Sequence, residues 1–157
     1  MPVLSLGGEH RLPIRLGLAG LLPFIATALG AWWAPGAWSV YAIQAFVYYS
    51  AVILSFLGGI HWGLAMGRDA PKSPTFRGRV MLSMAPSLMA WPALLWGGAQ
   101  GTALLMFGYI AIAVRGYEAS ATGSVGLPEW YRGLRNVLTI VVVACHLAVI
   151  LRFWQLL

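Results

Sequence analysis

The sequence predicts an all-α integral membrane protein, in which five transmembrane helices form a bundle with the N-terminus inside and the C-terminus outside. Composition gives the fold class: 60% of the residues are apolar and 9% are charged, whereas about 25% of the residues of soluble domains are charged. The basic residues are also gathered in three places that alternate with uncharged gaps. This is the positive-inside pattern of a multi-spanning membrane protein.

The distribution of basic residues sets the predicted orientation. Of the ten Lys and Arg residues, all but Arg152 lie before the first apolar run, between the second and third, or between the fourth and fifth; they are Arg11, Arg15, Arg68, Lys72, Arg77, Arg79, Arg115, Arg132 and Arg135. The gaps at 34–39 and 97–102 carry no charge. Because cytoplasmic loops are enriched in Lys and Arg, the three basic places are expected inside. Arg152 is expected outside, with its long stem reaching the outer head groups.

Span length defines the first two helices. A hydrocarbon core of about 30 Å needs about 20 predominantly apolar residues in a helix. The first span is expected at 14–33, interrupted only by Pro23 and Thr27. The second is expected at 40–67, which is long enough to tilt or to project beyond the bilayer.

The same criterion places three further spans in the second half of the chain. The third is expected at 80–97, with Pro86 and Pro92 inside it. The fourth, at 100–116, has a short apolar core, so the third and fourth could instead form a shallow helical hairpin. The fifth is expected at 135–157. The loops are too short for separate domains, so the sequence predicts a single membrane domain over 1–157.

Three glycines recur at every fourth position near the end of the second span: Gly59, Gly63 and Gly67. Small residues at this spacing let another helix approach closely, and such contacts drive helix association in membranes. The glycines are therefore expected to form a packing interface. The partner is either another helix of this chain, a partner subunit, or a second copy of the protein.

His61 is an ionisable residue inside the second span, close to its cytoplasmic end. The helical repeat turns it away from Gly59 and toward the side that carries Arg68. Ionisable groups at membrane depth are costly and are functional candidates by default. The alternative is a neutral histidine that is hydrogen-bonded to a neighbouring helix.

Aromatic and arginine residues alternate at the predicted inner end of the fifth span: Trp130, Tyr131, Arg132 and Arg135. Such a cluster suits anionic lipid head groups or a quinone-like head group, and the alternative is simple anchoring of the helix at the interface. Lipid head groups are expected to contact Arg68, Arg132 and Arg135.

Haem or quinone are the cofactors that this pattern would allow, although neither is predicted outright. The candidate binding residues are His61, Trp62, Trp130, Tyr131 and Arg135. A haem held by two histidines would pair His61 with His146, which the spans place at different depths. No zinc motif, phosphate-binding loop, serine-nucleophile motif or carboxylate pair is present, so no metal site and no catalytic residue are predicted. No basic face suits nucleic acid.

Two short clusters carry a family resemblance. They are Phe56–Gly63, and Leu127–Tyr131 followed by Leu134–Arg135 and Leu138–Thr139. Together they resemble the transmembrane protein 69-like family of small multi-spanning membrane proteins. The resemblance implies a bacterial inner membrane, or the mitochondrial inner membrane in a eukaryote, and implies no activity. The positions that match its motifs are His61, Trp62, Trp130, Tyr131 and Arg135.

These observations predict a small non-enzymatic membrane protein, an accessory, assembly or structural subunit of an inner-membrane complex. It would pack through the glycine positions 59, 63 and 67 and carry a functional edge at the cytoplasmic interface. One alternative is a membrane redox protein that binds haem or quinone. A further alternative is a small transporter or channel, although the spans offer few polar groups and no carboxylate at midplane.

Overall fold

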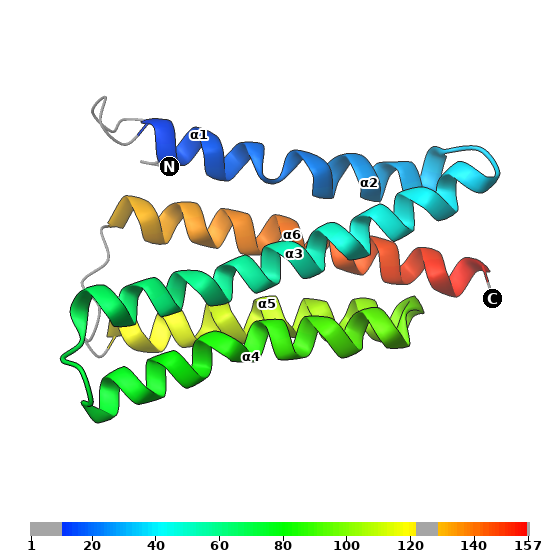
Figure 1. The fold of residues 1–157 in the computed structure, drawn as a ribbon. Helices are drawn as coiled ribbons and strands as arrows, with labels where there is room; N and C mark the ends of the chain where they lie inside the picture. The colour runs from blue at the N-terminus through cyan, green and yellow to red at the C-terminus, as the bar shows by residue number, and fades with distance from the viewer. Residues whose placement is uncertain (1–10, 122–128, 157) are drawn as a thin grey trace.

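The computed structural model describes residues 11–121 and 129–156, with side chains over 11–116 and 130–156. Every regular element in this part of the chain is a helix: α1 (Arg11–Ala19), α2 (Leu22–Trp33), α3 (Ala37–Arg68), α4 (Pro74–Trp96), α5 (Gly98–Ala121) and α6 (Glu129–Leu156). Figure 1 shows α1 and α2 end to end, with the other helices running back and forth beside them. The predicted all-α fold class is confirmed.

Three of the described segments are long and apolar enough to cross a membrane: Arg11–Trp33, Ala37–Arg68 and Trp130–Leu156. Helices α4 and α5 contain 23 and 24 residues, a length that also suffices at about 1.5 Å per residue, but their composition is less apolar. The helices thus indicate an integral membrane protein. The count of five spans and the inside–outside orientation stay predictions.

The helices begin a few residues before the spans read from hydrophobicity. A helix can continue into the head-group region, where water and lipid solvate its polar residues, so apolar length underestimates helix length. Pro86 and Pro92 do not interrupt α4, which runs through both.

The first predicted span is two helices rather than one. The break lies at Gly20 and Leu21, and Pro23 stands at the start of α2. A proline has no backbone N–H and is tolerated in the first turn of a helix, so α2 restarts there. The carbonyl oxygen of Gly20 accepts a hydrogen bond from the hydroxyl of Tyr49 on α3 at 3.0 Å. A side chain of α3 therefore satisfies one backbone group freed by the break.

Glycines allow close contact between α3, α4 and α5. A Cβ at Gly58 would meet the carbonyl oxygen of Ser83 and lie 3.3 Å from the ring of Pro86. A Cβ at Gly101 would likewise meet the carbonyl of Ala93. These helices approach one another closely because the contact positions have no side chain.

A polar centre joins α3, α5 and α6 inside the apolar core. Ser50 Oγ lies 2.8 Å from Nε2 of His146, and the other ring nitrogen, Nδ1, lies 2.8 Å from the carbonyl oxygen of Val142. The hydroxyl of Tyr109 donates to the carbonyl of Ser50 at 2.7 Å. His146 is fully buried and packs edge-on against Phe46, with 4.8 Å between ring centroids. Both nitrogens of this imidazole are therefore engaged within the protein.

Arg152 connects the end of α6 to α2. Its Nε donates to the carbonyl oxygen of Ala31 at 2.9 Å, and its guanidinium carbon lies 5.8 Å from the ring centroid of Trp32. The Trp32 indole in turn donates to the carbonyl of Ala148 at 3.0 Å. The residue expected to reach the outer head groups thus serves mainly as a contact between helices.

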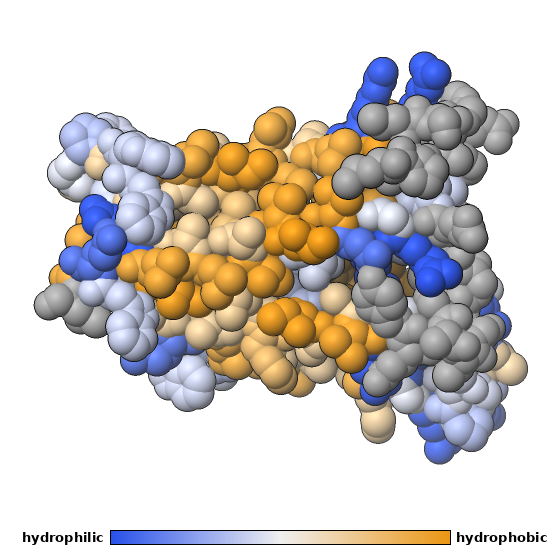
Figure 2. Space-filling model, turned by 180° about the vertical axis from the view of Figure 1, so that it is seen from behind, coloured by the Kyte–Doolittle hydropathy of each residue, from blue (hydrophilic) through white to orange (hydrophobic). Residues whose placement is uncertain are grey.

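The outer surface of the bundle is apolar over its middle. Figure 2 shows a broad hydrophobic band on one face, with hydrophilic residues gathered toward both ends. The exposed side chains include many large apolar ones, such as Val52 and Phe56 on α3 and Leu151 on α6. An apolar band between polar ends suits lipid tails between two head-group layers.

Candidate functional site

A cavity of about 280 Å³ lies between α1, α2, α3, α5 and α6. Most of its lining side chains are apolar, and they include Leu21, Phe24 and Leu57. Cavities that bind small ligands begin at about this size, and they combine an apolar lining with a few polar groups.

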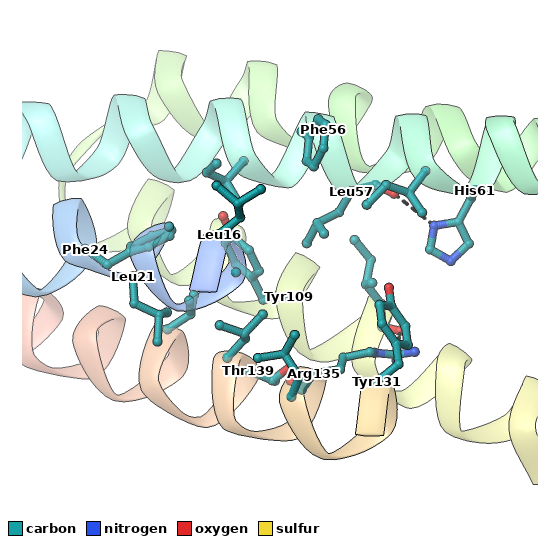
Figure 3. Close-up of a pocket in the computed structure, with 18 residues that line it drawn as sticks. Leu16, Leu21, Phe24, Phe56, Leu57, His61, Tyr109, Tyr131, Arg135 and Thr139 are labelled. Carbon is teal, nitrogen blue, oxygen red and sulfur yellow. Dashed lines mark hydrogen bonds between the residues drawn. The ribbon is translucent and has the colours of Figure 1, made fainter. Parts of the chain in front are cut away.

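The polar groups of the cavity gather toward one end. Figure 3 shows His61 projecting from α3, and Tyr131 and Arg135 projecting from α6 on the opposite wall. Leu21 and Phe24 lie at the other end of the same space. The cavity therefore has an apolar end and a polar end, which is the arrangement an amphiphile requires.

Arg135 is held against α5 by backbone carbonyls. Its Nη2 donates to the carbonyl oxygens of Ile112 at 2.8 Å and Ala113 at 2.6 Å. A Cβ at Gly116 would meet the guanidinium itself, so the glycine makes room for it. Thr139 donates within α6 to the carbonyl of Arg135 at 2.9 Å. These contacts fix a cation in the wall of an otherwise apolar cavity.

His61 is oriented by its own helix. Its Nδ1 lies 2.9 Å from the carbonyl oxygen of Leu57, one turn earlier in α3. The ring is partly exposed and lines the cavity. The histidine predicted as a functional candidate thus faces the cavity rather than packing into the core.

The broken first span forms one wall of the cavity. Leu16, Gly17 and Gly20 line it. A Cβ at Gly17 would lie 3.3 Å from a methyl group of Leu134, so α1 packs closely on α6 at this point. The discontinuity between α1 and α2 therefore lies beside the cavity. Non-helical backbone at membrane depth is tolerated where protein or a cavity surrounds it.

The structure gathers three of the five predicted cofactor-binding residues around the cavity: His61, Tyr131 and Arg135. The other two lie elsewhere. Trp62 is 44% exposed beside His61 and does not line the space. Trp130 is not a lining residue either; its ring packs edge-on against Tyr131 at 5.8 Å between centroids. The side chains of Trp62 and Trp130 therefore point away from the space that their neighbours His61 and Tyr131 line.

Sequence reasoning missed Tyr109 and the residues of α1 as lining groups. Tyr109 is the one tyrosine of the fourth predicted span and lies near its middle, and this was the available signal. No sequence signal indicated that α1 lines the cavity, because this depends on how α1 packs against α6. Leu127 and Pro128, which carry part of the family resemblance, lie outside the described residues.

Within the part of the chain that the structure describes, the three predicted packing glycines do not meet another helix. A Cβ at Gly59, Gly63 or Gly67 would have no heavy atom within 4 Å, apart from the neighbouring residues in the chain and the backbone of α3 itself. The glycine that packs internally is Gly58, one position earlier. Arg68, one of the residues expected at lipid head groups, is exposed at the end of α3. Arg132 is also exposed, whereas Arg135 turns inward to the cavity.

The two intramembrane histidines have different surroundings. His61 lines the cavity, whereas His146 is in the buried polar centre, with Nε2 bonded to Ser50. A haem ligated by both would need the Nε2 or Nδ1 of His146, and both atoms are already engaged. The quinone alternative requires no such pair.

The apolar helices and their arrangement define an integral membrane protein, and comparison with known proteins agrees. Residues 10–151 match a family described as "Protein of unknown function (DUF3429)". The chain belongs to this family.

Curated relatives named "Transmembrane protein 69" also match. The protein of Xenopus tropicalis is 36% identical over 131 residues, which are 83% of this chain and 50% of the relative. That of Mus musculus is 30% identical over 132 residues, which are 82% of this chain and 51% of the relative. The chain thus spans about half the length of these relatives. No solved structure matches. The predicted resemblance to this family is confirmed.

Proposed function

We propose that this protein is a non-enzymatic protein of the bacterial inner membrane, or the mitochondrial inner membrane in a eukaryote, that binds a quinone-class amphiphile. One observation carries the proposal: His61, Tyr131 and Arg135 meet at the polar end of an apolar cavity of about 280 Å³. Quinones of membranes join a small polar ring to a long apolar tail. The polar ring would lie between α3 and α6, and the tail would leave through the apolar part.

The size of the cavity supports a ring-sized ligand. An engineered apolar cavity of about 150 Å³ is large enough for benzene, so the space here suits a substituted six-membered ring and the first part of a chain. Leu16 and Phe56 both line the cavity and are each 64% exposed. They give the tail a route to the lipid between α1 and α3.

The proposed site would lie at the cytoplasmic edge of the membrane. The polar end of the cavity is close along the chain to Arg68 and Arg132, which are among the residues that set the predicted positive-inside orientation. A head group at this depth would remain near the interface while its tail stayed in the apolar layer.

A cavity-filling variant tests the proposal. Leu57→Trp places a bulky side chain in the cavity, whereas Val52→Trp makes the same change at a position that is 64% exposed on the same helix. Purified protein would be extracted with organic solvent, and the bound quinone quantified by mass spectrometry. We expect quinone with the unmodified protein and with Val52→Trp, and a loss of about ten-fold or more with Leu57→Trp, because that variant leaves no room for the ring.

The proposal fails if the unmodified protein carries no quinone and binds none when it is reconstituted with an added short-chain quinone. It also fails if Leu57→Trp is folded and retains as much quinone as Val52→Trp.

A second proposal is that the protein also acts as an accessory or assembly subunit. The observation that favours it is the open face at Gly59, Gly63 and Gly67, on which none of the described helices packs. Such a face would accept the helix of a partner subunit or of a second copy.

A further inference from the structure

We infer that the cavity selects a head group that donates a hydroxyl proton to His61, so that it holds the hydroquinone state of its ligand rather than the quinone state. The inference rests on the proposed quinone-class function and adds the chemical state of the head group. It follows from the hydrogen-bonding roles of the side chains at the polar end.

His61 presents an acceptor to the cavity. The carbonyl oxygen of Leu57 can only accept, so the Nδ1 atom 2.9 Å away must carry the ring proton. In the neutral ring with a proton on Nδ1, Nε2 is a lone-pair acceptor. Among the described residues, no group is hydrogen-bonded to this Nε2.

The opposite wall presents donors. The guanidinium of Arg135 has only N–H groups. Its Nη2 donates to two carbonyls of α5 and its Nη1 also lies against Gly116 of that helix, whereas no described residue accepts a hydrogen bond from Nε. The hydroxyl of Tyr131 can donate or accept. Figure 3 shows these two residues across from His61. A matching head group must therefore donate toward α3 and accept from α6.

A hydroquinone meets both requirements and a quinone meets one. The two oxygens of a quinone are carbonyls that only accept hydrogen bonds. They can accept from Arg135, but they cannot donate to Nε2 of His61. Each oxygen of a hydroquinone carries a proton and lone pairs, so it can donate to His61 on one side and accept from Arg135 on the other. An unsatisfied acceptor in a low-dielectric site is costly, and this gives a preference of about ten-fold.

The test compares ligands with the same decyl tail and a six-membered ring that either carries hydroxyl protons or lacks them. The protein is placed in phosphatidylcholine nanodiscs, whose head groups carry no hydroxyl donor. Binding of a decyl hydroquinone, its dimethyl ether and the corresponding quinone is measured by equilibrium dialysis under nitrogen. We expect the hydroquinone to bind about ten-fold more tightly than the other two.

Variants of His61 assign the preference to this residue. His61→Phe should lower the affinity for hydroquinone to that for the ether, whereas His61→Gln, which keeps an acceptor near the position of Nε2, should retain part of the difference. Tyr48→Phe serves as the control, because Tyr48 is exposed on the same helix and does not line the cavity. If His61→Phe does not fold, the comparison of the three ligands on the unmodified protein decides alone.

Equal affinities for the three ligands would overturn the inference and leave the proposed function standing. A lack of binding by all three would overturn both. Lipid hydroxyls offer the same chemistry as a hydroquinone, so a second set of nanodiscs contains phosphatidylglycerol. If this lipid displaces the hydroquinone by binding to His61 in its place, the ligand is a lipid and the inference about the hydroquinone fails.

Discussion

Arg135 shows how a single cation is accommodated between apolar helices. Its Nη2 donates to two carbonyl oxygens that are already part of α5, Ile112 and Ala113. A backbone carbonyl has two lone pairs and can accept a second hydrogen bond without leaving the helix. The guanidinium reaches them because Gly116 has no side chain.

Gly116→Ala should displace Arg135 from this position. The added methyl group would occupy the space of the guanidinium, so the two hydrogen bonds to α5 would be lost or weakened. We expect a destabilisation of about 1–3 kcal/mol, measured by thermal unfolding in detergent, together with weaker binding of the cavity ligand.

Gly78→Ala on α4 is the matched control, because a Cβ there meets nothing within 4 Å. It should be neutral or slightly stabilising, since alanine favours helix more than glycine does. Equal unfolding temperatures for the two variants would show that Gly116 does not position Arg135.

Three of the five residues predicted to bind a cofactor line the cavity, and two do not. Ionisable and aromatic groups at membrane depth singled out His61, Tyr131 and Arg135, which all line the cavity. The same criterion selected Trp62 and Trp130, which do not. Residue type and depth identify candidates, but direction depends on how each helix is rotated against its neighbours.

Helix α3 has two glycine faces with different surroundings. Gly58 packs against α4, whereas Gly59, Gly63 and Gly67 contact no other helix among the described residues. One position along a helix turns a residue by about 100°, so neighbouring glycines can serve different partners. The spacing in the sequence identified a stripe of small residues but did not identify the side that α4 covers.

Gly63→Leu tests the open face. The substitution has room within the chain, so the protein should remain folded while a helix that packs closely on this face would be excluded. We expect loss of a cross-linked dimer or of a co-purifying partner in mild detergent. Gly78→Leu is the control, because it makes the same change at another open position.

If Gly63→Leu keeps the same assembly as the unmodified protein, the open face is covered by lipid alone, and the proposed accessory role loses its support.

The connections between the helices alternate between the two ends of the bundle. Figure 1 places the α3–α4 connection at the end where the described chain begins, and the α4–α5 connection at the opposite end. If all the helices cross the membrane, these two connections lie on opposite sides of it. If α4 and α5 form a shallow hairpin, they lie on the same side.

Cysteine labelling distinguishes the two arrangements. With the native Cys145 replaced by alanine, Ala70→Cys and Gln100→Cys each place one thiol at an exposed position in or beside these connections. A membrane-impermeant maleimide should label Gln100→Cys in intact cells and Ala70→Cys only after the membrane is opened, as the positive-inside rule predicts. Labelling of both sites from the same side would contradict the five-span topology.

The sequence by itself determined the class of protein, because apolar length and charge distribution depend on the bilayer rather than on contacts within the chain. It also identified His61, Tyr131 and Arg135 as candidate binding residues. The tertiary structure decided that these three residues line one cavity, because α3 and α6 face each other across a space that no local sequence pattern predicts. It also decided that Arg152 binds α2, that His146 belongs to the core, and that the first span breaks at Gly20. The contacts of Arg152 and His146 depend on partners far along the chain, which only the packed bundle brings together, whereas Pro23 lies beside the break at Gly20.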